Sequence, residues 1–164
     1  MSPRSQRAFV ALGSNLGDSP ELLRSALVQL AELPDTTLVA QSSLQRTAPV
    51  GGPAGQSDYL NAVAELSTQL APPELLRALQ AIETSHGRDR AREERWGPRR
   101  LDLDLLLVGD DRVLSAELEL PHPRMEERSF VLEPLAELCP ELLLPKCQQT
   151  VRERCAVLRQ EVSA

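Results

Sequence analysis

The sequence predicts an α+β fold: a ferredoxin-like βαββαβ core in which helices pack on a mainly antiparallel sheet. The first observation is the order of the apolar patterns, which runs strand, helix, strand, strand, helix, strand. The second is the length of 164 residues, which suits a single domain over 1–164 with one compact core. The third is the composition: 41% of the residues are hydrophobic but only 2% are aromatic, so leucine, valine, alanine and isoleucine must build the core.

The first strand is predicted at residues 9–13, where an apolar run ends at Gly13. After a short loop, a helix is expected to begin at Ser19, which can cap it. Pro20 suits the first helical position and Glu21 suits the first turn. Leucines and alanines at helical spacing then carry the apolar stripe of this helix as far as Leu30.

The second and third strands are predicted at 36–47 and 59–68 from their β-branched, alternating residues. The loop between them, 48–58, is rich in glycine and proline and long for a small domain, which favours a functional role. A second helix is predicted over 73–85, because proline suits its first turn and Gly87 can end it.

The fourth strand is predicted at 101–108, followed by a turn at 109–111 and an extended segment over 113–120. Beyond a proline-rich turn at 121–124, two more helices are predicted, around 130–138 and over 151–162. No internal repeat and no long linker divides the chain into further domains.

The overall charge restricts the class of protein. A net charge of −6 argues against a general nucleic-acid binder. Because no apolar run approaches 18 residues and the N-terminus has no signal-peptide pattern, we expect a cytoplasmic protein without membrane contact. The three cysteines, Cys139, Cys147 and Cys155, form no CxxC pattern and are expected to be reduced thiols.

Positive charge is nevertheless concentrated in one segment. Six arginines lie within residues 88–100, against three acidic residues in the same stretch. Such a segment is either a solvated surface loop or a local anion site.

Two carboxylates interrupt the apolar strand at 101–108. Residues two apart face the same side of a strand, so Asp102 and Asp104 project together about 6.6 Å apart. At such a distance two like charges repel by about 3 kcal/mol at an effective dielectric near 20, so inside a site they need a cation. Oxygen ligands without histidine or cysteine favour Mg²⁺ or Mn²⁺, and an exposed or arginine-paired structural role is the alternative. The nearby arginines favour a triphosphate with its divalent ion.

Other residues restrict the type of site less firmly. A Walker-type phosphate loop is excluded, because the single lysine, Lys146, follows no glycine-rich loop. His122, in the proline-rich turn, is either an ordinary loop histidine or a site residue. Trp96, the only tryptophan, is either a core residue or part of a lid or stacking surface.

Ordered motifs along nearly the whole chain resemble one family, the 6-hydroxymethyl-7,8-dihydropterin pyrophosphokinases of folate biosynthesis. The motifs are ALGSNLGD at 11–18, YLNAV at 59–63, GRDR at 87–90, RWGPRRLDLD at 95–104, PHPR at 121–124, Arg128, and FVL at 130–132. The resemblance implies an ATP-dependent pyrophosphokinase that transfers the terminal pyrophosphoryl unit of ATP to the pterin hydroxymethyl group, giving AMP. It also implies two Mg²⁺ ions, held by Asp102 and Asp104, that clamp the phosphates and lower the pKa of the attacking hydroxyl.

The resemblance also implies roles at matching positions. The implied catalytic residues are Arg88, Arg99, Asp102 and Asp104. The implied ATP-binding residues are Gln80, Glu83, Arg88, Arg90, Trp96, Arg99, Leu105, His122 and Arg128. The implied pterin-binding residues are Thr47, Val50, Tyr59, Asn61, Trp96 and Phe130. A flat ring can stack between Tyr59 and Phe130, while the Asn61 amide offers a donor and an acceptor to its edge.

Some positions depart from the family pattern. Ala48 stands where proline is common, and Val108 stands where an aromatic residue is frequent. The segment 89–94 carries one residue more than some relatives, which leaves the roles of Arg90 and Arg92 undecided.

Two other functions share part of this pattern. A metal-dependent glycosyltransferase also uses Asp-x-Asp, but its usual domain is larger and shows a βαβ alternation that this chain lacks. A noncatalytic Mg-nucleotide or pterin-binding protein of the same fold is the second rival. The expected partners are ATP and 6-hydroxymethyl-7,8-dihydropterin, with no nucleic acid and no membrane, and the protein is expected to be a monomer.

Overall fold

A five-stranded antiparallel sheet forms the centre of the molecule in a computed structural model, which describes residues 4–49, 52–87 and 100–163. The strand order is β2–β4–β1–β5, and β3 also pairs with β4. The strands are β1 Gln6–Ser14, β2 Thr36–Gln41, β3 Gln45–Thr47, β4 Tyr59–Thr68 and β5 Asp102–Val108. The predicted α+β class and antiparallel sheet are confirmed, and the order of elements is that of a ferredoxin-like core.

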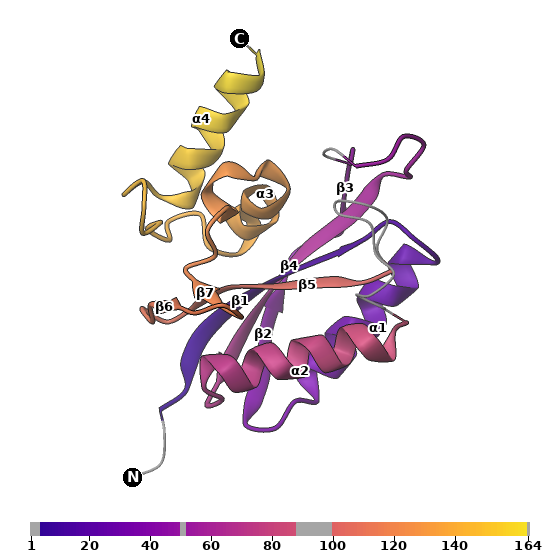
Figure 1. The fold of residues 1–164 in the computed structure, drawn as a ribbon. Helices are drawn as coiled ribbons and strands as arrows, with labels where there is room; N and C mark the ends of the chain where they lie inside the picture. The colour runs from indigo at the N-terminus through magenta and orange to yellow at the C-terminus, as the bar shows by residue number, and fades with distance from the viewer. Residues whose placement is uncertain (1–3, 50–51, 88–99, 164) are drawn as a thin grey trace.

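Helices cover the two faces of the sheet unequally. Helices α1 (Ser19–Ala31) and α2 (Pro72–Ser85) lie on one face, and α3 (Ser129–Leu138) and α4 (Val151–Ser163) lie on the other (Figure 1). Alternation along β1 divides the core accordingly, because Val10 and Leu12 pack with α1 and α2 whereas Phe9 packs with α3 and α4. On this second face the apolar packing involves only one end of β1 and β5. Among the described residues, neither α3 nor α4 covers the other end of that face, which lines a cavity.

A bulge in β5 separates the packed end from the open end. The pairing of β1 with β5 shifts register between Phe9 and Val10, and both Leu106 and Leu107 then join the core under α3 and α4. Before the shift, Asp104 pairs with Ala11 in regular alternation. The apolar half of the strand therefore anchors it, and the half that carries the aspartates faces the opening.

The predicted strand over 36–47 is wrong as a single element, because it is two strands broken at residues 42–44. Ser42 causes the break: its amide donates to the Val63 carbonyl at 2.9 Å, and its side-chain oxygen accepts from the Val63 amide, also at 2.9 Å. The Ser42 hydroxyl thus replaces a backbone carbonyl as the acceptor of one hydrogen bond between the strands. The extended segment over 113–120 is likewise two short strands, β6 (Val113–Leu114) and β7 (Glu119–Leu120), which pair with each other.

The first helix begins at Ser19 as predicted, but its cap is Asp18, whose carboxylate accepts from the Glu21 amide at 3.4 Å. The Ser19 hydroxyl instead lies 2.8 Å from the Ser14 hydroxyl, tying the helix to the end of β1. The second helix begins at Pro72, one residue before the predicted start. Gly87 ends it as predicted, with φ of 89° and its amide donating to the Thr84 carbonyl.

The C-terminal part begins with a short 3-10 turn, η1 (Met125–Glu127), which leads into α3. Helix α4 packs on α3 through Val151, Cys155 and Leu158, which are buried. Within the described ranges, no helix has the length and apolar character needed to cross a membrane.

Candidate active site

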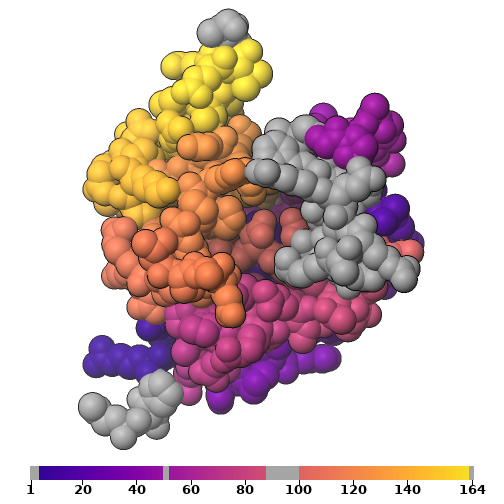
Figure 2. Space-filling model, viewed as in Figure 1, coloured from indigo at the N-terminus to yellow at the C-terminus, as the bar shows by residue number. Residues whose placement is uncertain are grey.

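The open end of the sheet forms the floor of a cavity of about 740 Å³. The lining residues are Ala11, Leu12, Gly13, Thr47, Ala48, Tyr59, Asn61, Asp102, Asp104, Arg124, Glu127, Arg128, Ser129 and Phe130. Figure 2 shows this hollow between the orange residues that lead into α3 and the magenta residues of α2, with part of β5 visible at its base. Residues from four strands and from the turn before α3 therefore meet in one cavity.

The two aspartates lie where the strand pattern predicted them. Asp102 and Asp104 are half-buried in the cavity, whereas Leu103 between them is buried against α1 and α2. Asp102 pairs with Gly13 of β1, and Asp104 pairs with Ala11. The carboxylates thus stand on a rigid edge strand at the opening, where an apolar core does not surround them.

Gly13 leaves the middle of the floor bare. Across the sheet it pairs with Asp102 on one side and with Asn61 on the other. A Cβ atom at this position would lie 3.3 Å from Asn61 Oδ1 and 3.7 Å from Tyr59 Cδ1. The sequence pattern marks Gly13 only as the end of a strand, but in the fold it separates the carboxylate side of the cavity from the amide side.

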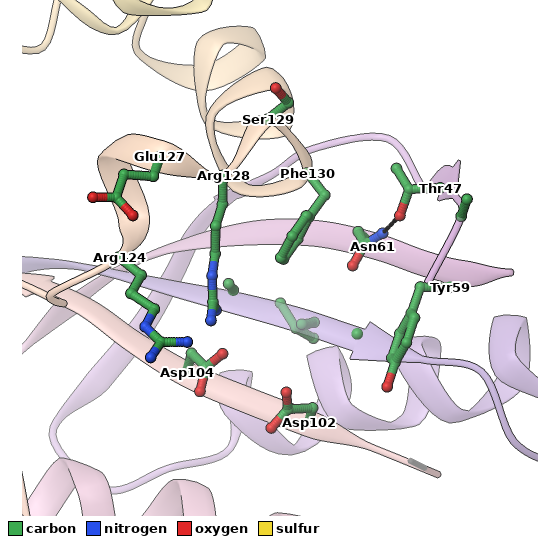
Figure 3. A pocket seen from close by; sticks show the side chains of 14 residues that line it. Thr47, Tyr59, Asn61, Asp102, Asp104, Arg124, Glu127, Arg128, Ser129 and Phe130 are labelled. Carbon is green, nitrogen blue, oxygen red and sulfur yellow. Dashed lines mark hydrogen bonds between the residues drawn. The ribbon is translucent and has the colours of Figure 1, made fainter. Parts of the chain in front are cut away.

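The amide side of the cavity has an aromatic and hydrogen-bonding character. Asn61 Nδ2 donates to Thr47 Oγ1 at 2.6 Å, which orients the amide. Tyr59 lies two residues along the same strand and Phe130 enters from α3 (Figure 3). Of the predicted pterin-binding residues, the fold brings Thr47, Tyr59, Asn61 and Phe130 into this one cavity.

The turn η1 supplies positive charge at the other edge of the opening. Arg124 and Arg128, which we call the arginine rim, lie on either side of this turn and line the cavity. The Arg128 guanidinium lies 5.5 Å from the centre of the Phe130 ring. Figure 3 shows both side chains reaching from the rim toward the strand that carries the aspartates.

The predicted site residues include Arg128 but not Arg124, Glu127 or Ser129, which also line the cavity. For Arg124 the signal was the PHPR motif. No local pattern pointed to the other two.

His122 lies in the turn next to this rim, and its side chain accepts a hydrogen bond. Its backbone amide donates to the Leu106 carbonyl at 2.9 Å, and its Nδ1 accepts from the Arg124 amide at 3.2 Å. In the neutral ring the proton therefore sits on Nε2. Burial lowers the pKa of His122 to about 4, and the positive charge of Arg128 acts in the same direction.

The predicted nucleotide-side residues of α2 and β5 do not line the cavity. Glu83 is 1% exposed, and its Oε2 accepts from the Leu103 amide at 2.8 Å, so it ties α2 to the free edge of β5. Gln80 is half-buried on the same helix. The Leu105 side chain is buried toward α1 and α2, which leaves only its backbone to meet a ligand.

Five predicted site residues lie outside the described residues. They are Val50, Arg88, Arg90, Trp96 and Arg99. The described chain stops at Gly87 and resumes at Arg100, whose side chain lies close to two glycines. A Cβ atom added to Gly17 would lie 3.1 Å from Arg100 Nη1, and one added to Gly87 would lie 3.2 Å from Arg100 Cδ.

The sequence is similar to proteins of one family. A family model described as 7,8-dihydro-6-hydroxymethylpterin-pyrophosphokinase (HPPK) matches residues 9–140. The chain is 51% identical over 140 residues to the 2-amino-4-hydroxy-6-hydroxymethyldihydropteridine pyrophosphokinase of Pseudomonas aeruginosa, covering 85% of each chain. It is 46% identical over 141 residues to the protein of the same name from Haemophilus influenzae, covering 86% of each.

Solved structures resemble the fold at low sequence identity. One is a crystal structure of an HPPK-DHPS in complex with substrates, with a TM-score of 0.74 and 11% identity over 98% of this chain. Another is the wild-type HPPK-DHPS of Plasmodium falciparum with pterin and p-hydroxybenzoate, with a TM-score of 0.74 and 14% identity over 99% of this chain. This chain spans only 44% and 45% of those longer chains, so the likeness concerns the fold of one part of each.

Proposed function

The chain belongs to the 7,8-dihydro-6-hydroxymethylpterin-pyrophosphokinase family, and on that premise we propose how its residues carry out the family reaction. The chain is an ATP-dependent pyrophosphokinase of folate biosynthesis. It transfers the terminal pyrophosphoryl unit of ATP to the hydroxymethyl group of 6-hydroxymethyl-7,8-dihydropterin. The hydroxymethyl oxygen bonds to the β-phosphorus of ATP and releases its proton to solvent. The bond from that phosphorus to the α–β bridging oxygen breaks, and AMP leaves with that oxygen.

Asp102 and Asp104 are the proposed protein ligands of two Mg²⁺ ions. Both carboxylates line the cavity from one face of β5. Among the residues that the structure describes, no three His, Cys, Asp or Glu side chains gather as a closed metal site. A pair of carboxylates that leaves other positions to phosphates and water suits Mg²⁺. When bound, Mg²⁺ neutralises phosphate charge and lowers the pKa of the attacking hydroxyl, so no protein base is obligatory.

The pterin is proposed to bind over Gly13, with its hydroxymethyl group toward the aspartates. Tyr59 and Phe130 offer aromatic surface for a flat ring. Because Thr47 accepts one Asn61 N–H, the amide keeps a defined orientation, with its Oδ1 next to the bare backbone of Gly13. The pairing of Gly13 with both Asn61 and Asp102 supports a ligand that touches the amide and the metal side at once.

The phosphates of ATP are proposed to lie between the aspartates and the arginine rim. The Arg128 guanidinium offers planar charged donors that suit phosphate oxygens. Neutral His122 can donate a hydrogen bond from Nε2 without changing the charge of the site. Arg88, Arg90, Trp96 and Arg99 remain proposed nucleotide or closing-loop residues, and Gln80 and Leu105 remain proposed contacts on the nucleotide side.

The observation that carries this proposal is that the two aspartates share one cavity with Asn61, Tyr59 and Phe130. The test is to incubate the protein with MgATP and 6-hydroxymethyl-7,8-dihydropterin and to separate the nucleotides. We expect AMP and pterin diphosphate in equal amounts, and no product when EDTA removes the metal. Binding of both ligands without AMP would favour the noncatalytic alternative, and ADP as product would refute pyrophosphoryl transfer.

Oligomeric state and location stay predictions. We infer a monomer and a cytoplasmic protein. Light scattering at assay concentration and fractionation of the source cells would test these two expectations.

A further inference from the structure

The turn that carries the arginine rim contains a buried carboxylate that faces away from the cavity. Glu126 is the second residue of η1 and is 6% exposed. It is absent from the cavity lining, whereas Arg124, Glu127 and Arg128 around it are present. Because a buried carboxylate is costly unless it is hydrogen-bonded, its partners show what this residue does.

The partners of Glu126 all come from the C-terminal segment. Its Oε2 accepts from the Lys146 amide at 2.9 Å, and its Oε1 accepts from the Cys147 amide at 2.8 Å. Its backbone carbonyl accepts from Arg154 Nε at 2.7 Å. The Lys146 ammonium also donates to the Pro123 carbonyl at 3.0 Å. Four hydrogen bonds therefore tie residues 123–126 to residues 146–154.

The C-terminal segment, residues 141–163, is held in place by its own hydrogen bonds and by packing. The Leu144 amide donates to the Gln149 carbonyl at 2.8 Å, and the Val151 amide donates to the Leu142 carbonyl at 2.9 Å, which closes a tight turn over 145–148. Helix α4 then packs on α3 through buried residues. Figure 1 shows this yellow segment beside the orange turn that precedes α3.

The rim benefits from such a support because two of the three backbone hydrogen bonds of its turn are long. The Met125 amide lies 3.4 Å from the His122 carbonyl, and the Arg128 amide lies 3.4 Å from the Met125 carbonyl, whereas the Glu127 amide donates to the Arg124 carbonyl at 3.1 Å. A single 3-10 turn with bonds of this length holds its ends weakly. Transfer of a phosphoryl group depends on charged donors that are held in place before the reaction.

We propose that Glu126 is a positioning residue, which fixes Arg124 and Arg128 by binding the two backbone N–H groups of the 145–148 turn. Residues 141–163, which follow the matched family region 9–140, are then a working part of the site. The inference rests on the proposed function, since it assumes that the arginine rim acts on the phosphates of ATP.

The test compares Glu126→Gln and Glu126→Ala with Glu133→Gln. Glu133 provides a control, because its carboxylate also binds the C-terminal part, through bonds of 2.9 and 2.6 Å from Arg159, but it lies on α3 and not in the turn that carries the rim. Rates are taken per folded enzyme, with the folded fraction measured by circular dichroism. In Glu126→Gln one of the two N–H groups loses its acceptor, and we expect kcat/KM for MgATP to fall about tenfold.

The pattern of kinetic effects separates positioning from a purely structural role. We expect the KM for the pterin to change less than about twofold in Glu126→Gln, because Thr47, Tyr59 and Asn61 come from other strands. A purely structural role would reduce the folded fraction and leave kcat/KM per folded enzyme unchanged. That result, or an equal loss in Glu133→Gln, overturns the proposal. If Glu126→Ala does not fold, Glu126→Gln decides.

A double-mutant cycle then tests whether Glu126 acts through the rim. We expect Glu126→Gln to cost less than about twofold when Arg124 and Arg128 are both alanine, because no rim remains to be positioned. An undiminished loss in that background would refute positioning of the rim. If Arg124→Ala and Arg128→Ala both leave the wild-type rate unchanged, the proposed role of the rim fails instead, so the two failures are distinguishable.

Discussion

Adding a single methyl group at Gly13 should block the pterin without harming the fold. Gly13 is the second-last residue of β1 and pairs with β4 on one side and with β5 on the other, in a strand conformation that alanine also adopts. Replacing glycine by alanine in a strand removes an entropic cost of about 0.5–1 kcal/mol. This gain offsets the close contact of 3.3 Å between the new Cβ and Asn61 Oδ1, so Gly13→Ala should be about as stable as the wild type. A loss of function would therefore have to come from the cavity.

The size of that loss follows from the contacts of the added methyl group. It would stand 3.3 Å from Asn61 Oδ1 and 3.7 Å from the Tyr59 ring, inside the space proposed for the ligand. Separating the pterin edge from the Asn61 amide leaves polar groups unpaired, which costs about 1–3 kcal/mol. Overpacking in the same place adds about 1–3 kcal/mol. Together they cost about 2–6 kcal/mol and predict pterin binding about 30- to 20,000-fold weaker.

Calorimetric titration with the pterin and with MgATP separately is the assay. We expect the Gly13→Ala protein to lose pterin affinity while its affinity for MgATP changes less than about threefold, since the aspartates and the arginine rim are untouched. Asn61→Ala serves as the control background, where the added methyl group should cost much less because its closest neighbour is gone. Pterin affinity within about threefold of the wild type in Gly13→Ala would refute binding over the bare strand.

Three further predictions concern the proposed metal ligands, the loss of stability at acid pH, and the hydrogen bond between Glu83 and β5. Asp102→Asn and Asp104→Asn should each lower kcat by about 1,000-fold or more at moderate Mg²⁺, because metal clamping contributes several kcal/mol to the transition state, and near-normal rates in quenched-flow assays would exclude the metal clamp. Because the pKa of His122 is lowered from its usual 6.5 to about 4, the unfolded chain binds this proton first as the pH falls. Urea unfolding should therefore show about 1–2 kcal/mol of stability lost between pH 6.5 and 4, after solvent screening, and His122→Asn should lack this part of the slope. Glu83→Ala should lose about 1–3 kcal/mol in urea unfolding, because it leaves the buried Leu103 amide unpaired. An unchanged stability with a raised KM for ATP would instead indicate that Glu83 serves mainly to bind nucleotide.

The order of elements was predictable because it depends on local chemistry. The alternation of residues around Asp102 and Asp104 determines which face of the strand carries the carboxylates. Gly87 ends α2 because it adopts a positive φ, which is a property of the residue itself. The break between β2 and β3 was not predictable, because it depends on the Ser42 hydroxyl meeting the Val63 amide twenty-one residues away. The cap of α1 was assigned to the wrong neighbour, since Asp18 and Ser19 are both good caps and only the packing against Ser14 distinguishes them.

The site likewise has residues that the sequence predicts and features that only the fold shows. Motifs named Asp102, Asn61 and Phe130, because the chemistry of each is written in its own residue type and neighbours. They did not reveal that Gly13 lies between the first two, since that depends on the register of three strands. They also did not reveal that Glu126 is buried against the 145–148 turn.

The sequence by itself determined the residue types of this protein's site, the faces they occupy on each strand and the family to which the chain belongs. The tertiary structure decided which of those residues share a cavity and which, such as Glu83 and Leu105, turn toward the core instead. The physical reason is range: strand and helix periodicity arises between close neighbours in the chain, whereas a cavity arises where distant segments pack. Such packing depends on strand register and on burial of the whole core, and no short stretch of sequence contains either.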